Sequence, residues 1–132
     1  MVLVDSNVIL DVIEDDEVWA EWSQGQMDAI AMREDLTINP VIYAELSLAF
    51  ARIEELEAFV ASAEFRLLET PREALFLAGK AFLAYRKQGG TRTGVLPDFF
   101  IGAHAAVMDL PLLTRDSARY RTYFPDIQLI AP

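Results

Sequence analysis

The first eleven residues constrain the fold most strongly, because they predict a buried strand that ends at an acid. Residues 2–4 form an unbroken apolar run, typical of a strand buried on both faces of a parallel sheet. Asp5 follows directly, and Ser6 or Asn7 can cap a helix that begins at Val8. Ligands of open α/β sheets bind outside the carboxyl ends of the strands, so Asp5 would face that crevice. Taken alone, however, Asp5 is explained better as a turn or capping residue.

The rest of the chain alternates short apolar runs with helical patterns. Further strands are expected at 36–38, 110–113 and 127–130, and residues 65–68 form either a short strand or a connector. Helices are expected at 8–13, 18–32, 40–52, 54–63, 71–87, 97–107 and 117–122. This alternation predicts an α/β fold with one parallel or mostly parallel sheet between layers of helices. The length of 132 residues predicts a single domain over 1–132.

Composition excludes several classes of protein. Hydrophobic residues make up 53% of the chain, which favours a packed core over disorder. No stretch approaches the ~20 apolar residues of a membrane span, and no basic segment precedes an apolar run at the N-terminus. Cysteine is absent, which excludes a disulfide framework and a thiolate metal site. We therefore expect a cytoplasmic protein without membrane contact.

Charge is distributed unevenly along the chain. The net charge of −10 argues against a general nucleic-acid binder, because phosphate contacts need Lys and Arg. Residues 1–66 hold 15 acidic and 3 basic residues, whereas residues 67–132 hold 6 acidic and 8 basic ones. An anionic ligand is thus expected to meet the second half. Arg92, in a flexible Gly- and Thr-rich loop, and Arg115 are the candidates for substrate contact, with ordinary solvated side chains as the alternative.

Four acids can converge at the carboxyl edge of this sheet. Asp5 and Asp116 follow strands, and Glu45 and Asp98 lie in helices that begin near the same edge. Each has a simpler explanation alone. Glu45, among apolar neighbours, would form a structural salt bridge, Asp98 would favour the dipole of its helix, and Asp116 would cap the next helix.

Together, the four acids point to metal chemistry. Clustered carboxylates repel one another and raise one another's pKa unless a cation neutralises them. The hard cations Mg²⁺ and Mn²⁺ prefer such oxygens and also bind substrate phosphate. His104 is the only histidine, about 600° around its helix from Asp98, so we expect it to be a packing or surface residue rather than a zinc ligand or base. Metal-assisted phosphodiester hydrolysis is the chemistry that remains.

Four segments in order resemble the successive signatures of PIN-domain ribonucleases. They are Asp-Ser-Asn-Val-Ile-Leu at 5–10, Pro-Val-Ile-Tyr-Ala-Glu-Leu at 40–46, Leu-Pro-Asp-Phe-Phe-Ile-Gly-Ala-His-Ala at 96–105 and Leu-Leu-Thr-Arg-Asp at 112–116. Their order and spacing resemble most closely the VapC-type toxins of bacterial and archaeal toxin–antitoxin pairs. The resemblance covers nearly the whole chain and implies a three-layer α/β/α fold with a central, mostly parallel sheet.

The resemblance also implies a site and partners. Asp5, Glu45, Asp98 and Asp116 would be catalytic and would hold Mg²⁺ or Mn²⁺, while Asn7 and Thr114 would support the site through hydrogen bonds. The protein would then be a metal-dependent endoribonuclease and the toxin of a type II toxin–antitoxin system.

Its expected partners are an RNA substrate, a second copy of itself within a hetero-oligomer, and a cognate antitoxin. That antitoxin would cover Trp19, Trp22 or neighbouring helical surface and close the cleft at Asp5 and Asp98. The two Trp side chains are otherwise expected to be packing residues.

Two departures and one alternative remain. His104 stands where the family usually has a small or hydroxylic residue, and Phe99-Phe100 is a bulky pair that would narrow access beside Asp98. A haloacid-dehalogenase-type phosphatase needs a second Asp where Asn7 stands, and a receiver domain needs an acidic pair after its first strand. The alternative function is a catalytically inactive PIN-like domain that only binds RNA or a protein, although all four acids are intact.

Overall fold

The computed structural model describes residues 1–132 and contains a five-stranded sheet in the order β3-β2-β1-β4-β5. Every neighbouring pair of strands is parallel. The strands are β1 (Val2–Val4), β2 (Leu36–Ile38), β3 (Arg66–Leu67), β4 (Leu112–Leu113) and β5 (Leu129–Ile130). The expected parallel sheet is confirmed, and β1 is its central strand.

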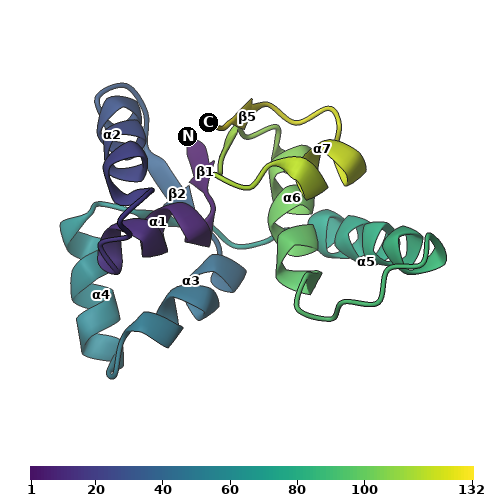
Figure 1. Ribbon diagram of the computed structural model, residues 1–132, viewed down its shortest axis with the longest axis horizontal. Helices are drawn as coiled ribbons and strands as arrows, with labels where there is room; N and C mark the ends of the chain where they lie inside the picture. The colour runs from purple at the N-terminus through teal and green to yellow at the C-terminus, as the bar shows by residue number, and fades with distance from the viewer.

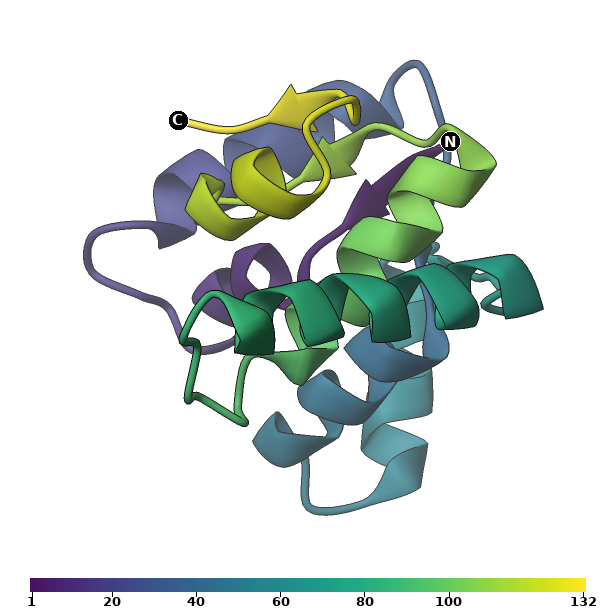
Figure 2. The same cartoon turned by 90° about the vertical axis from the view of Figure 1, so that its right-hand side faces the viewer.

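Two groups of helices flank this sheet. The helices are α1 (Ser6–Ile13), α2 (Ala20–Ala31), α3 (Pro40–Leu46), the 3₁₀ turn η1 (Ser47–Ala49), α4 (Ile53–Ser62), α5 (Arg72–Lys87), α6 (Leu96–Met108) and α7 (Ala118–Tyr123). Figure 1 shows α1 to α4 on one side of β1 and α5 to α7 on the other, which is the three-layer arrangement expected. Figure 2 shows α5 crossing α6, against which it packs. None of the helices has the length and apolar character needed to cross a membrane.

The central strands are buried on both faces, as their apolar sequences predict. Leu3, Val4, Leu112 and Leu113 have no exposed side-chain surface. Helices on both faces explain why these strands carry continuous apolar runs instead of alternating ones. The carboxyl ends of β1 and β4 consequently lie side by side, with Val4 opposite Leu113.

The helix that begins at Pro40 differs from the predicted one. Asn39 caps it, because its Oδ1 accepts a hydrogen bond of 2.9 Å from the backbone N–H of Ile42. However, the helix and its 3₁₀ turn end at Ala49, not at Arg52. The hydroxyl of Ser47 bonds to the carbonyl of Ala44, a local bond that competes with helical pairing. Leu48, in this 3₁₀ turn, is 87% exposed.

The start of α1 also corrects the sequence prediction. The residue at the cap position is Asp5, and the helix begins at Ser6, two residues earlier than expected. Asp5 makes no side-chain capping bond. The side chains of Ser6 and Asn7 bond instead to residues far away in the chain, Glu45 and Thr114. The sequence that looked like a capping signal therefore supplies side chains to the carboxyl edge of the sheet.

A close approach between α6 and α7 carries a tyrosine to that edge. Gly102 in α6 permits the approach, since a Cβ there would lie 2.4 Å from the ring of Phe124 and 3.1 Å from the ring of Tyr120. Tyr120 is only 1% exposed as a result. Its hydroxyl reaches Asp5, at the end of β1.

Candidate active site

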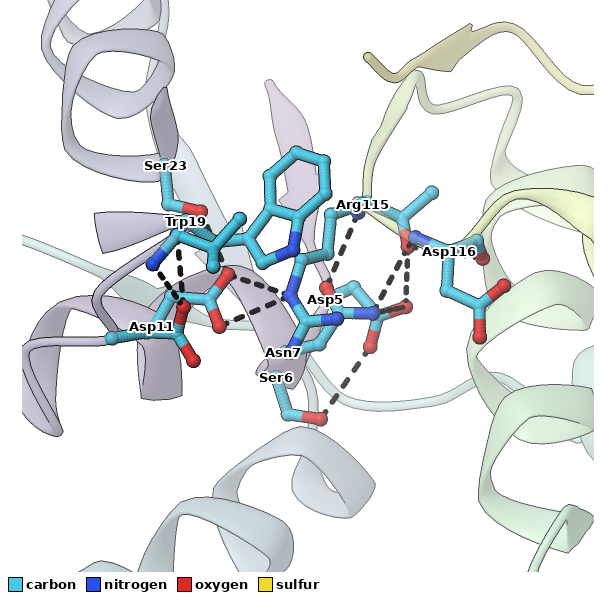
Figure 3. A network of polar contacts seen from close by, with 11 residues as sticks. Asp5, Ser6, Asn7, Asp11, Trp19, Ser23, Arg115 and Asp116 are labelled. Carbon is cyan, nitrogen blue, oxygen red and sulfur yellow. Dashed lines mark hydrogen bonds and ion pairs between the residues drawn. The ribbon is translucent and has the colours of Figure 1, made fainter. Parts of the chain in front are cut away.

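Asp5 is the centre of the candidate site. It follows β1 directly and is 4% exposed. Its Oδ2 accepts hydrogen bonds from the hydroxyls of Thr114, at 2.9 Å, and Tyr120, at 2.8 Å. Its Oδ1 has only the distant hydroxyl of Ser6, at 3.4 Å. One carboxylate oxygen is thus fixed by two strong donors, whereas the other has only the long contact with Ser6, which Figure 3 shows.

Asn7 and Thr114 support Asp5, as the family resemblance implied. The Nδ2 of Asn7 lies 3.3 Å from Thr114 Oγ1 and 3.5 Å from Asp5 Oδ2. The Oδ1 of Asn7 accepts from the backbone N–H of Arg115, at 3.3 Å. The start of α1 is thereby joined to the end of β4.

Glu45 and Asp98 reach the site from two helices. In α3, Glu45 is half-buried and accepts a 2.8 Å hydrogen bond from the hydroxyl of Ser6. Asp98 lies in the first turn of α6, where it was expected, and its Oδ2 accepts a hydrogen bond of 2.5 Å from Arg119. No sequence pattern identifies Ser6 as the partner of Glu45 or Arg119 as the partner of Asp98.

Asp116 lies at the rim. Its side chain is exposed and forms no hydrogen bond, and the cap position of α7 is Ser117, which makes no side-chain bond either. The capping role considered for Asp116 is therefore wrong. Its backbone N–H donates to Thr114 Oγ1 at 3.1 Å, which holds the residue beside the site.

The four carboxylates interact electrostatically. Burial raises the pKa of Asp5 from 3.8 to about 6, hydrogen bonds from Tyr120 and Thr114 oppose this rise, and the charges of Asp98 and Glu45 add to it. Burial and the charge of Asp98 raise the pKa of Glu45, while Ser6 opposes the rise. For Asp98, burial raises the pKa, Arg119 opposes the rise and the charge of Asp116 adds to it. The structure therefore brings all four predicted acids into one electrostatic cluster.

The chemistry of these residues fits a hard divalent cation. The cluster offers carboxylate oxygens, which Mg²⁺ and Mn²⁺ prefer, and a bound cation would favour the ionised form of carboxylates whose pKa values burial and mutual repulsion raise. No three acidic or His side chains already stand in a ligand arrangement. Ser6 and Arg119 hold Glu45 and Asp98 in their present positions.

A second network, which the sequence did not reveal, anchors the loop after β4. Asp11 in α1 is 2% exposed, and both its oxygens accept from Nε of Arg115, at 2.8 and 3.0 Å. The hydroxyl of Ser23 also donates to Asp11, and the guanidinium of Arg115 lies 5.8 Å from the centre of the Trp19 ring. Figure 3 shows this network beside Asp5. The available signal was Asp11 itself, an acid on an apolar helix. This anchor gives Arg115 a structural role, and its contact with substrate stays a prediction.

His104 and Phe99 lie in the core and not in the acidic cluster. His104 is 1% exposed, its Nδ1 lies 3.2 Å from Asn39 Nδ2, and burial lowers its pKa. The expected packing role of His104 is confirmed. Phe99 is fully buried, with its ring 5.2 Å from that of Tyr123, so it does not narrow the cleft. Phe100 lines an open apolar hollow of about 510 Å³ beside Glu45.

Comparisons with known proteins agree with this arrangement. The family model described as PIN domain matches residues 2–125. A chain of VapBC2 from Rickettsia felis, solved bound to a promoter DNA fragment, is 15% identical with a TM-score of 0.74, covering 100% of this chain and 99% of that one. FitAcB from Neisseria gonorrhoeae is 20% identical with a TM-score of 0.69, and the match covers 98% of this chain and 96% of that one. A chain of a toxin–antitoxin complex from Klebsiella pneumoniae is 16% identical with a TM-score of 0.69, and the match covers 98% of this chain and 96% of that one. No curated protein matches the sequence.

The raised pKa of Asp5 predicts an unusual pH dependence of stability. The folded protein binds a proton at Asp5 more tightly than the unfolded chain does, since the pKa is about 6 instead of 3.8. Stability due to this group is thus present below about pH 4 and is lost as the pH rises through about 6. Asp5→Asn keeps an oxygen for Thr114 and Tyr120 but removes the charge.

Relative to the wild type, Asp5→Asn should therefore gain up to about 3 kcal/mol of unfolding free energy between pH 4 and 7. Urea unfolding in the presence of a chelator measures this difference at each pH. A difference that stays constant from pH 4 to pH 7 would show that Asp5 titrates normally.

Proposed function

This chain belongs to the PIN-domain family, and on that premise we propose that it is a metal-dependent endoribonuclease, the toxin of a type II toxin–antitoxin pair. The observation that carries the proposal is the cluster of Asp5, Glu45, Asp98 and Asp116 at the carboxyl edge of the sheet. Three of these carboxylates have raised pKa values, which is the electrostatic state that a divalent cation relieves.

The four acids would hold Mg²⁺ or Mn²⁺ and would be the catalytic residues. When bound, such an ion activates water and stabilises the charge that develops on the phosphate. The chain's own contribution is orientation. Thr114 and Tyr120 fix one oxygen of Asp5 and so direct the other toward the cluster. Asn7 keeps Thr114 in place, and the buried surroundings of Asp5 limit the access of bulk water.

The first test is cleavage of a single-stranded RNA by the purified protein with Mg²⁺ or Mn²⁺. We expect Asp5→Asn to lower the cleavage rate by more than about 100-fold, since even residues that only support metal ligands cost 10- to 100-fold. Asp28→Asn is the matched control, because Asp28 is an exposed acid on α2, bonded only to Gln24. Wild-type protein that binds RNA but never cuts it would favour the non-catalytic alternative. Equal rates for wild type and Asp5→Asn would refute the assignment of Asp5.

An antitoxin partner is the second part of the proposal. The apolar hollow beside Glu45 is lined by residues of α3, η1 and α6, namely Pro40, Val41, Ala44, Leu48, Leu96, Pro97 and Phe100. An acidic cleft next to an apolar hollow suits a segment that carries Arg and large apolar side chains. The similarity to chains from toxin–antitoxin complexes supports this partner. We also propose that the toxin pairs with itself within the complex.

Coexpression tests the partner. The protein, tagged, should co-purify with the product of an adjacent small gene, and expression without that product should slow growth. Asp5→Asn should retain the partner and abolish the growth defect, because the substitution removes charge without removing apolar surface. Failure to co-purify, together with normal growth when the wild type is expressed alone, would contradict the toxin assignment even if the protein cleaves RNA in vitro.

A further inference from the structure

A second hollow, polar and basic, adjoins the acidic cluster. It has a volume of about 460 Å³ and is lined by Arg92, Thr93, Gly94, Val95, Asp98 and Arg119. Val95 is its one apolar residue, in contrast to the hollow beside Glu45. Two arginines thus meet beside an acid of the cluster in a protein whose net charge is −10. The positive charge of this hollow, in an otherwise acidic protein, needs an explanation.

The two arginines have hydrogen-bonding capacity to spare. Arg119 in α7 is partly buried, and its only side-chain bond runs from Nη1 to Asp98. A guanidinium carries five N–H donors, so most of those of Arg119 remain unused. The side chain of Arg92 is exposed and makes no hydrogen bond or ion pair. By contrast, Arg52, Arg66 and Arg115 are all paired with acids and lie outside this hollow.

The loop that carries Arg92 is anchored at several points. The backbone N–H of Arg92 donates to the hydroxyl of Tyr85, at 3.1 Å. Gly90 lies against the Tyr85 ring so closely that a Cβ there would be 2.4 Å from it. At the start of the loop, the hydroxyl of Tyr123 donates to Gln88 at 3.0 Å. Contacts with α5 and α7 therefore hold the backbone of Arg92 in the wall of the hollow that Arg119 also lines.

We propose that Arg92 and Arg119 form a subsite for a backbone phosphate of the RNA, next to the acidic cluster. The inference rests on the proposed ribonuclease function and adds where the substrate is held. A planar guanidinium binds phosphate oxygens bidentately, and the hydroxyl of Thr93 is a further donor in the same hollow. Four acids alone would repel an anionic substrate. Two arginines at their edge offset that repulsion and fix the register of the strand.

Salt dependence of RNA binding tests the subsite. A single-stranded, fluorescently labelled RNA is titrated with Asp5→Asn protein at fixed Mg²⁺ over a series of salt concentrations. Each phosphate contact contributes about 0.7 to the slope of log K against log salt concentration. Arg92→Ala and Arg119→Ala should each reduce the slope by about that amount. Arg119→Lys should retain the slope and bind more weakly, since it keeps the charge but loses the planar fork.

Arg121→Ala is the matched control, because Arg121 is an exposed arginine of the same helix that does not line the hollow. Unchanged slopes in Arg92→Ala and Arg119→Ala, or an equal reduction in Arg121→Ala, would overturn the subsite. RNA cleavage by the wild type is measured in parallel. Cleavage with unchanged slopes would refute the subsite alone, whereas neither cleavage nor RNA binding would refute the ribonuclease function and the subsite with it.

Discussion

The burial of one carboxylate at the end of the central strand governs this structure. An unpartnered buried carboxylate is costly, so Asp5 requires donors, and the fold supplies them from distant parts of the chain. Thr114 follows β4 and Tyr120 lies in α7, 109 and 115 residues away in sequence. The close packing of α7 on Gly102 brings the hydroxyl of Tyr120 to Asp5. The two hydrogen bonds that offset the cost of burying Asp5 also fix the orientation of its carboxylate.

The other acids are accommodated in the same way. Glu45 has Ser6, Asp98 has Arg119, and Asp116 remains in solvent. Hydroxyls and one guanidinium thus allow the acidic cluster to exist without a cation. The pKa rises of Asp5, Glu45 and Asp98 come first from burial and then from the charges of neighbouring acids. Arg119 can satisfy Asp98 and still present donors to a phosphate. The cluster and the basic hollow share Asp98, which is why we propose that they act on one substrate.

The sequence predicted the parts of this site that depend on local patterns. Apolar runs followed by acids located Asp5 and Asp116, because parallel strands share one carboxyl edge, and the predicted helix at 40–52 located Glu45. The sequence could not predict the roles of Tyr120 and Arg119, because they lie on a six-residue helix with no readable periodicity. Their partners are determined by tertiary packing alone. For the same reason the sequence suggests Ser6 or Asn7 as a cap and does not reveal the ion pair of Asp11 with Arg115.

The central claim is that these acids form a divalent-cation site, and diffraction from crystals grown with Mn²⁺ tests it most directly. The account predicts an anomalous peak within about 2–2.5 Å of an oxygen of Asp5 and of at least one of Glu45 and Asp98. The peak should be absent from crystals of Asp5→Asn. Wild-type crystals grown with millimolar Mn²⁺ that show no peak at these carboxylates, or the same peak in Asp5→Asn, would contradict the account.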